Sequence, residues 1–227
     1  MPASPRSLFL ATPCHNHHVH KNYHASVLQL ATCGRYNLAT TAMGGGGVSI
    51  ARNKIAAIYL DTKADRIFWP DSDVSFTPAD VDALWDRDLP IVGAFYAHKD
   101  AKEVRWSARG AGKDPDPATG LVELQAIGMG GIMIKREVFE TMAKVLPELA
   151  YKEDWTDGKG KVKHAFFSEA VVHDPANGFT EPTLLSEDWM FAYHARRCGY
   201  TVWGDTKVQF GHWEGGTCFP VQTGQPS

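Results

Sequence analysis

The chain has 227 residues, a formal charge of −3 at pH 7, 44% hydrophobic residues and 22% charged residues. This balance is typical of a folded globular protein and excludes a largely disordered or coiled-coil chain, and the length predicts one α/β domain over residues 1–227. The small negative charge, without a run of lysine or arginine, gives no general attraction to nucleic acid or to an anionic membrane.

The cysteine pattern and the first residues of the chain indicate the cellular compartment in which the protein is expected. The cysteines are scattered without a Cys-x-x-Cys pair, which favours reduced thiols over a disulfide framework. Residues 1–11 contain only a short apolar run, too short for a signal sequence or a membrane anchor. We therefore expect a cytoplasmic protein without a transmembrane segment, in the host cytoplasm if the protein is viral. The cysteines are Cys14, Cys33, Cys198 and Cys218.

The first half of the chain alternates short apolar runs with amphipathic segments, which predicts a succession of strands and helices. Pro13 should end the first strand, Gly34 should end the first helix, and Ser49 should cap the second helix. The core face of that helix would consist of Ala51, Ile55, Ile58 and Thr62. Strands joined by helices imply right-handed crossovers and a parallel sheet. Strands are expected at 7–12, 36–42, 66–70 and 90–96, and helices at 23–33, 51–62 and 78–86.

The second half is less regular. Residues 97–120 show no clear period and predict a loop, while residues 148–183 are polar and interrupted by glycine and proline, which predicts a mobile region over a site. A helix with Ser186 as its cap should end at Gly199. Strands are expected at 121–126, 128–134, 200–203 and 208–212, and helices at 136–145 and 187–198.

Asp71 and Asp73 follow the apolar run 66–70 directly, whereas the other Asp-x-Asp pairs of the chain fall in helix or loop patterns. In open parallel sheets, ligands bind beyond the carboxyl ends of the strands, and carboxylates there can hold Mg²⁺ or Mn²⁺ against phosphate oxygens. The pair therefore predicts a metal and phosphate site, and an acidic turn is the alternative.

Two further motifs allow more than one interpretation. The segment 14–24 carries half of the ten histidines, yet its spacing fits no zinc motif, so a polar loop is favoured over a histidine-metal site. The glycines 44–47 precede a helix and could cradle an anion, but the lysine and hydroxyl residue of a P-loop are missing, and a flexible loop is the alternative.

Glu187 and Asp188 stand in the first turn of an expected helix. Acids there favour the helix dipole by about 0.3–1 kcal/mol each, so they need no catalytic role to be explained. As catalytic groups they could accept a proton from a substrate hydroxyl, which is the alternative interpretation.

These motifs together resemble, in type and in order, the nucleotide-sugar glycosyltransferases of the GT-A fold, in particular the family-two-like group that includes phage and large-virus members. The resemblance covers residues 7–214 and implies an α/β, GT-A (Rossmann-like) fold, with a mostly parallel sheet sandwiched by helices. The motifs that carry it are Ala51-Arg52-Asn53, Asp71-Ser72-Asp73, Gly128-Met129-Gly130-Gly131, Ser186-Glu187-Asp188-Trp189 and Gly211-His212.

The resemblance implies a metal-dependent glycosyltransferase that moves a sugar from a nucleotide-diphosphate-sugar to a carbohydrate or other hydroxyl acceptor. Mn²⁺ or Mg²⁺ would be held by Asp73, Asp71 and His212, with the ribose as an alternative partner for Asp71. A bound cation would stabilise the leaving diphosphate as a Lewis acid. UDP is expected ahead of GDP as the nucleotide.

The resemblance also implies roles for residues around the nucleotide-sugar donor. Thr12, Pro13 and Arg52 match positions that line the nucleotide pocket, and Gly130 and Gly131 match a strand that passes under the donor sugar. Asp188, beside Glu187, matches the acceptor-activating base of inverting members, whereas in a retaining enzyme it would hold a sugar hydroxyl. The family often has an acidic residue after the proline, where this chain has 15–20, rich in histidine.

Two other functions remain open from the sequence. A nucleotidyltransferase of similar fold uses the same pair of carboxylates, but it predicts a basic glycine-rich signature after the first strand, where this chain has 13–20. A non-catalytic sugar- or nucleotide-binding module would keep the fold and bind a donor without cleaving it.

Overall fold

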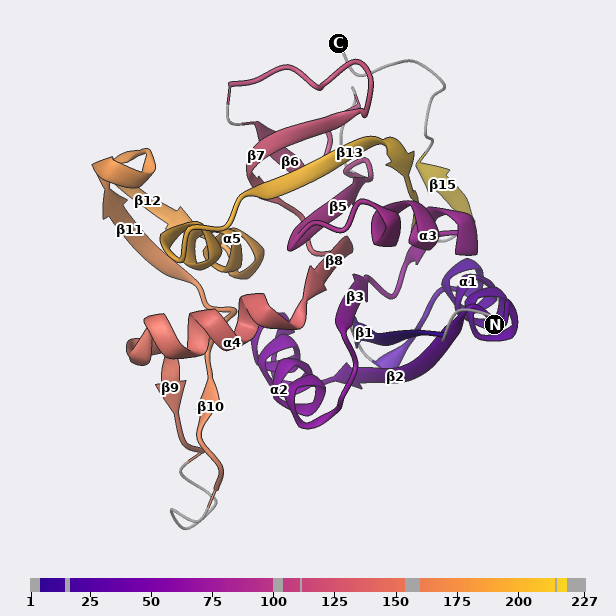
Figure 1. The fold of residues 1–227 in the computed structure, drawn as a ribbon, viewed down its shortest axis with the longest axis horizontal. Helices are drawn as coiled ribbons and strands as arrows, with labels where there is room; N and C mark the ends of the chain where they lie inside the picture. The colour runs from indigo at the N-terminus through magenta and orange to yellow at the C-terminus, as the bar shows by residue number, and fades with distance from the viewer. Residues whose placement is uncertain are drawn as a thin grey trace.

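The computed structural model describes residues 5–14, 17–99, 104–110, 112–153, 160–214 and 216–219. In this part of the chain, an eight-stranded sheet forms the centre of the molecule, and Figure 1 shows it nearly edge-on. Its strands, in spatial order, are β2 (Tyr36–Gly44), β1 (Arg6–Cys14), β3 (Arg66–Pro70), β8 (Gly131–Lys135), β5 (Ile91–Phe95), β13 (Val202–Gln209), β7 (Leu121–Ile127) and β6 (Ala108–Gly110).

The sheet is mixed. Strands β2, β1 and β3 pair in parallel, as do β5 and β13, but β8 lies antiparallel to both β3 and β5, and β7 lies antiparallel to β13. The expected parallel pairing therefore holds for the first three strands, while β7 and β8 run opposite to β5 and β13 and make the sheet mixed. Only residues 128–130 separate β7 from β8, and the chain runs through both strands in the same direction.

Helices cover both faces of this sheet (Figure 1). The side chains of β1 alternate between two cores: Phe9 and Ala11 pack with the helices of one face, and Leu8 and Leu10 with those of the other. Strands buried on both faces are expected to be largely apolar, as β3 and β5 are. Helices α2 (Val48–Asp61), α4 (Arg136–Val145) and α5 (Glu187–Arg197) contribute to the first core, and α1 (Lys21–Thr32) and α3 (Pro78–Asp86) to the second.

Local sequence explains where several elements begin and end. Helix α3 begins where expected, because Thr77 accepts from the Asp80 amide and the Asp80 carboxylate accepts from the Thr77 amide, a reciprocal capping box. Helix α2 instead begins after Gly47, and Ser49 is not its cap. Ala51 and Ile55 are buried as expected, but Ile58 is exposed and Tyr59 is buried in its place.

Pro13 does not end the first strand. β1 pairs with β2 over its whole length, from Arg6 to Cys14, but with β3 only at 8–10. Beyond Leu10 one side of β1 has no paired strand, and a proline there removes no hydrogen bond from the middle of the sheet.

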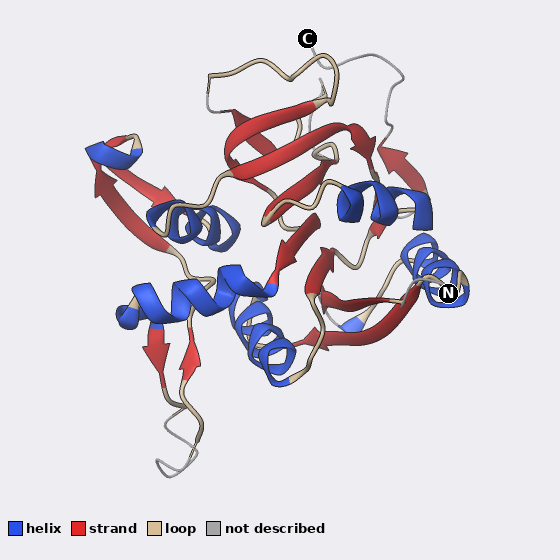
Figure 2. Cartoon of the chain, viewed as in Figure 1, coloured by secondary structure: helices blue, strands red, loops and turns tan. Residues whose placement is uncertain are grey.

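The expected loop 148–183 contains two hairpins, which project from the sheet in Figure 2. Short two-stranded ribbons leave most of their residues exposed, so they lack the long apolar runs that reveal a buried strand. Residues 15–16 and 154–159, which the sequence also singled out, lie outside the described residues. The hairpins and their linking turns are η2 (Pro147–Leu149), β9 (Ala150–Tyr151), β10 (Lys163–His164), β11 (Ala170–Asp174), η4 (Pro175–Asn177) and β12 (Phe179–Leu185).

A second, three-stranded sheet consists of β15 (Thr217–Phe219), β14 (Gly211–Glu214) and β4 (Val74–Ser75). All four cysteines are free, as expected. No helix in the described part of the chain has both the length and the apolar character needed to cross a bilayer.

Candidate functional site

A cavity of about 540 Å³ opens where β1, β3 and β5 end and α2 and α5 begin. Strand ends and helix starts meet at this edge because the parallel strands of the sheet point the same way. The wall residues used below are Pro13, the segment 45–48, Arg52, the segment 71–73, Tyr96, Glu187 and Asp188.

The turn that carries Asp71 and Asp73 is held by main-chain hydrogen bonds from three segments. The Ser72 carbonyl accepts from the His20 amide at 2.7 Å, the Asp71 carbonyl from the Val74 amide at 3.1 Å, and the Asp73 carbonyl from the Trp213 amide at 2.9 Å. The two carboxylates are therefore presented to the cavity by a turn whose backbone is fixed, which favours ligand binding without rearrangement.

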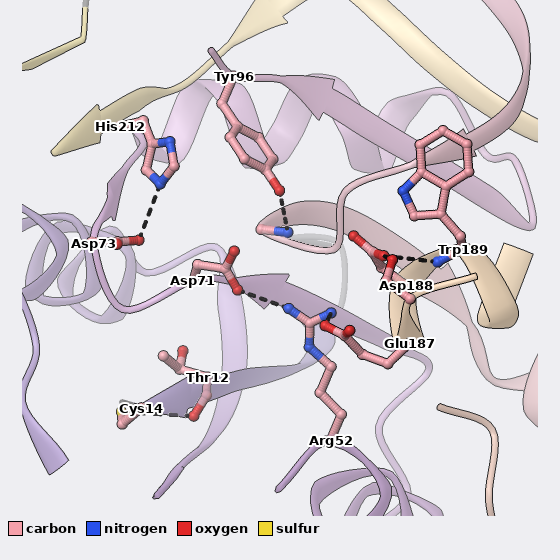
Figure 3. Close-up of polar contacts among 12 residues, drawn as sticks. Thr12, Cys14, Arg52, Asp71, Asp73, Tyr96, Glu187, Asp188, Trp189 and His212 are labelled. Atoms are coloured by element: carbon pink, nitrogen blue, oxygen red, sulfur yellow. Dashed lines mark hydrogen bonds and ion pairs between the residues drawn. The ribbon is translucent and has the colours of Figure 1, made fainter. Parts of the chain in front are cut away.

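His212 reaches Asp73 through the small sheet. Strand β14 pairs antiparallel with β4, with His212 opposite Val74, and the His212 Nε2 atom lies 3.5 Å from Asp73 Oδ1. His212 Nδ1 lies 2.8 Å from the Ala97 carbonyl. Because a carbonyl only accepts, Nδ1 carries the hydrogen, and Nε2 is turned toward the carboxylate (Figure 3).

Arg52 joins two of the acidic segments. Its side chain is almost fully buried, and it donates to Asp71 Oδ1 at 3.0 Å and to Glu187 Oε1 at 3.3 Å. Figure 3 shows the guanidinium between the two carboxylates. The Arg52 guanidinium thus links the end of β3 to the start of α5. Its buried Nε atom has no hydrogen-bond partner among the described residues.

Asp188 is held by its own helix turn. Its Oδ1 atom accepts from the Trp189 amide at 2.8 Å and from the Ser186 hydroxyl. Ser186 occupies the cap position of α5 as expected, but its hydroxyl binds Asp188 and makes no bond to a backbone amide of the helix. The carboxylate is therefore oriented by α5 and faces the cavity from the side opposite Asp73 (Figure 3).

The glycines before β8 bring the chain close to the acidic turn. A Cβ atom on Gly130 would overlap the Asp71 carboxylate, and one on Gly128 would overlap the Tyr96 hydroxyl. The Gly130 amide donates to the Tyr96 hydroxyl at 3.2 Å. Only glycine permits this approach of backbone to side chain.

The ionisation of the acids differs with their surroundings. Burial raises the pKa of Asp71 despite the nearby Arg52, and burial likewise raises the pKa of Glu187. Burial alone would also raise the pKa of Asp73, but the interactions of its carboxylate with His212 and Lys99 outweigh it and lower the pKa to about 2. The cavity therefore contains one firmly ionised carboxylate and two that would gain from a cation.

The residues expected to bind a metal are only partly assembled. Among the described residues, no group of three His, Cys, Asp or Glu side chains is arranged to hold an ion, because Asp71 is turned to Arg52 and Asp73 is paired with Lys99. The donor set nevertheless fits Mn²⁺ or Mg²⁺ in kind: two carboxylates and an imidazole whose second nitrogen is fixed by a carbonyl, as in metal-binding histidines.

The other residues expected at the site fall into two groups. Pro13 and Arg52 line the cavity and Gly130 touches its acidic turn. The Thr12 hydroxyl is instead buried against the Tyr23 hydroxyl at 2.6 Å, and Gly131 packs against Phe210. Burial raises the pKa of Tyr23 to about 12, so this contact joins two neutral groups.

Several residues at the site were not singled out from the sequence as parts of it. Tyr96 and Lys99 follow β5, Cys14 ends β1 and His17 follows it, so each stands at or just beyond the carboxyl end of a strand. That position is itself the signal that could have identified them. The glycine segment 45–47 has positive φ at every residue and leads into α2 at the cavity wall.

Comparison with known proteins adds a fold to this geometry. No protein-family model matches the chain, and no curated protein matches it. Among solved structures, the chain is similar to the viral protein A197 from STIV, with a TM-score of 0.53 and 15% identity over 92% of this chain and 86% of that chain. The two chains share an overall fold. At this identity the similarity concerns the fold alone.

Proposed function

We propose that this chain is a metal-dependent glycosyltransferase, which moves a sugar from a nucleotide-diphosphate-sugar to an acceptor hydroxyl. The observation that carries the proposal is the grouping of four carboxylates, from the segment after β3 and from the start of α5, around one buried arginine in a single cavity. The position of this cavity at the carboxyl ends of the strands supports a nucleotide-binding role.

The charges of the cavity favour a cationic metal together with an anionic substrate. The four acids Asp71, Asp73, Glu187 and Asp188 face one arginine and one lysine, so they leave a surplus of negative charge that would repel a diphosphate. Asp73, Asp71 and His212 would hold a divalent cation, which supplies Lewis-acid stabilisation to the leaving diphosphate. Binding would require Lys99 to leave Asp73, since one carboxylate oxygen contacts its ammonium.

Arg52, Tyr96 and Asp188 would then have different roles in the reaction. Arg52 neutralises and orients Asp71 and Glu187. Tyr96 holds the Gly130 amide, which keeps the glycine segment close to the acidic turn. The oriented carboxylate of Asp188 would take the proton of the acceptor hydroxyl if the reaction inverts the anomeric centre, and would hold a sugar hydroxyl if it retains it.

The test is a calorimetric titration with UDP and with GDP, each with and without Mn²⁺. Wild type should bind one nucleotide, UDP ahead of GDP, only when Mn²⁺ is present. Asp73→Ala should lose that binding while its circular dichroism stays unchanged, because the proposed cation site would lose one of its carboxylate ligands.

Asp114→Ala is the matched control for this experiment. Asp114 is an exposed member of another Asp-x-Asp pair, away from the cavity, and its removal should leave nucleotide binding unchanged. Metal-dependent binding that survives Asp73→Ala would contradict the proposed site, and wild-type protein that binds neither nucleotide would contradict the proposed function.

A further inference from the structure

A second cavity, of about 400 Å³, lies beside the first. Its walls come from β6, from the residue before β11, from the end of β12 and from the start of α5, so the β11–β12 hairpin, which the sequence did not reveal, helps to build it. Its polar and aromatic wall residues are Arg109, Glu169, Thr183, Ser186 and Trp189, and Leu184 adds an exposed apolar surface.

The first turn of α5 separates the two cavities. Glu187 and Asp188 line the first cavity, while their neighbours Ser186 and Trp189 line the second. Ser186, through its hydroxyl, and Trp189, through its amide, are also the residues that hold the Asp188 carboxylate. A molecule in the second cavity therefore touches the two residues that orient Asp188.

The chemistry of the walls indicates what kind of molecule fits. The Arg109 guanidinium lies 5.7 Å from the centre of the Trp189 ring, and the Glu169 carboxylate lines the same cavity. A guanidinium only donates hydrogen bonds and a carboxylate only accepts them. Together they suit neutral hydroxyls, which do both, and they suit a phosphate or an amine less well, because one of the two would repel it.

An indole beside these groups adds an apolar platform. A pyranose ring has a face of C–H groups that can stack on an aromatic ring, and a rim of hydroxyls that need donors and acceptors. Trp189 is only partly buried, so part of its ring is available to a ligand. A purely aliphatic ligand would leave Arg109, Glu169 and the hydroxyl of Thr183 without partners.

We propose that the second cavity is the acceptor site and that it takes a pyranose ring of a carbohydrate. This inference rests on the proposed function, and it narrows the acceptor from any hydroxyl compound to a glycan. The acceptor hydroxyl reaches Asp188 across the first turn of α5, while the donor occupies the cavity on the other side.

The experiment is saturation-transfer NMR with methyl glycosides of glucose, galactose, mannose and N-acetylglucosamine, with and without UDP and Mn²⁺. Acetylserine amide and octanol serve as peptide and lipid probes. The variants are Arg109→Ala and Glu169→Gln, which alter exposed side chains, and Trp189→Leu, whose fold is checked by circular dichroism. Val171→Ser is the control, because Val171 is 65% exposed on the same hairpin and does not line the cavity.

At least one methyl glycoside should bind wild type and the control equally, and bind Arg109→Ala and Glu169→Gln about tenfold more weakly, the effect of one lost polar partner. The inference is overturned if no glycoside binds, if both variants bind it as wild type does, or if only the serine or octanol probe binds. Wild type that binds UDP with Mn²⁺ but no glycoside refutes this inference alone, whereas glycoside binding without any nucleotide binding refutes the proposed function and the acceptor role with it.

Discussion

Asp188 is anchored through a single carboxylate oxygen. Oδ1 accepts from the Trp189 amide and from the Ser186 hydroxyl, and both bonds need only an acceptor. An asparagine side chain can keep Oδ1 in the same place. Asp188→Asn therefore removes the basicity of residue 188 without changing the geometry of the site.

Asp188→Asn should therefore bind UDP and Mn²⁺ as wild type does, yet lose transfer by about 10²–10⁴-fold, the usual contribution of a positioned general base. Calorimetry measures the first quantity and product formation measures the second. Ser186→Ala is the companion variant: it removes one orienting bond and keeps the carboxylate, so its loss of transfer should be smaller. Full transfer by Asp188→Asn would rule out the base role.

The residues of the site differ in how readily they can be predicted from the sequence. Asp71 and Asp73 could be singled out because an acidic pair directly after an apolar strand is unusual. Lys99 and Tyr96 stand in a stretch of ordinary composition, and their importance comes from contacts with residues distant in the chain. Such contacts depend on the order of strands in the sheet, which local patterns do not encode.

At the level of elements, the sequence predicted best what is decided locally. Helix α3 has its capping box and proline within one turn and matches the predicted range 78–86. The direction of β8 and the hairpins in 148–183 were missed, because they depend on which strand lies next to which. The distinction is physical: caps involve neighbours in the chain, whereas pairing involves partners far away in it.

The link between α3 and β13 provides a test of element packing. Asp205 on β13 is fully buried and accepts from the Nε atom of Arg87, at the end of α3, at 2.7 Å. Arg87→Met should lower the free energy of unfolding by about 3–5 kcal/mol, because it leaves a buried carboxylate without its partner. Urea denaturation measures the change.

Lys161→Met is the control, since Lys161 forms an ion pair with Asp61 in which both side chains are mostly exposed. Exposed pairs of this kind contribute little to stability. Equal effects of the two substitutions would show that Arg87 does not stabilise the junction of α3 and β13.

At the level of the whole molecule, the acidic cavity affects stability in two opposing ways. The pKa of Asp73 is lowered from 3.8 to about 2, so its charge stabilises the folded protein above pH 3.8, and that contribution is lost as the pH falls toward 2. The pKa of Asp71 is raised by burial, so the folded state favours its protonated form, and stability is lost as the pH rises through that pKa.

Asp71→Asn should therefore have a melting temperature at or above that of wild type at about pH 8, and the difference should shrink as the pH falls below the raised pKa of Asp71, because the wild-type carboxyl is then protonated and uncharged. Differential scanning calorimetry across this range provides the measurement. The same variant should lose metal-dependent nucleotide binding, which would place this residue among those that trade stability for function. A melting temperature below that of wild type at every pH would show that the bond to Arg52 outweighs the burial of the charge.

The pairing of β14 with β4 also has a consequence for the synthesis of the protein. The Asp73 carbonyl and carboxylate are positioned by Trp213 and His212, which the ribosome adds long after the acidic turn itself. A nascent chain can complete the three parallel strands and α3 and still lack the strand that positions Asp73. Competence to bind a nucleotide should thus arise late, when residues 211–214 have left the ribosome and β14 has paired with β4.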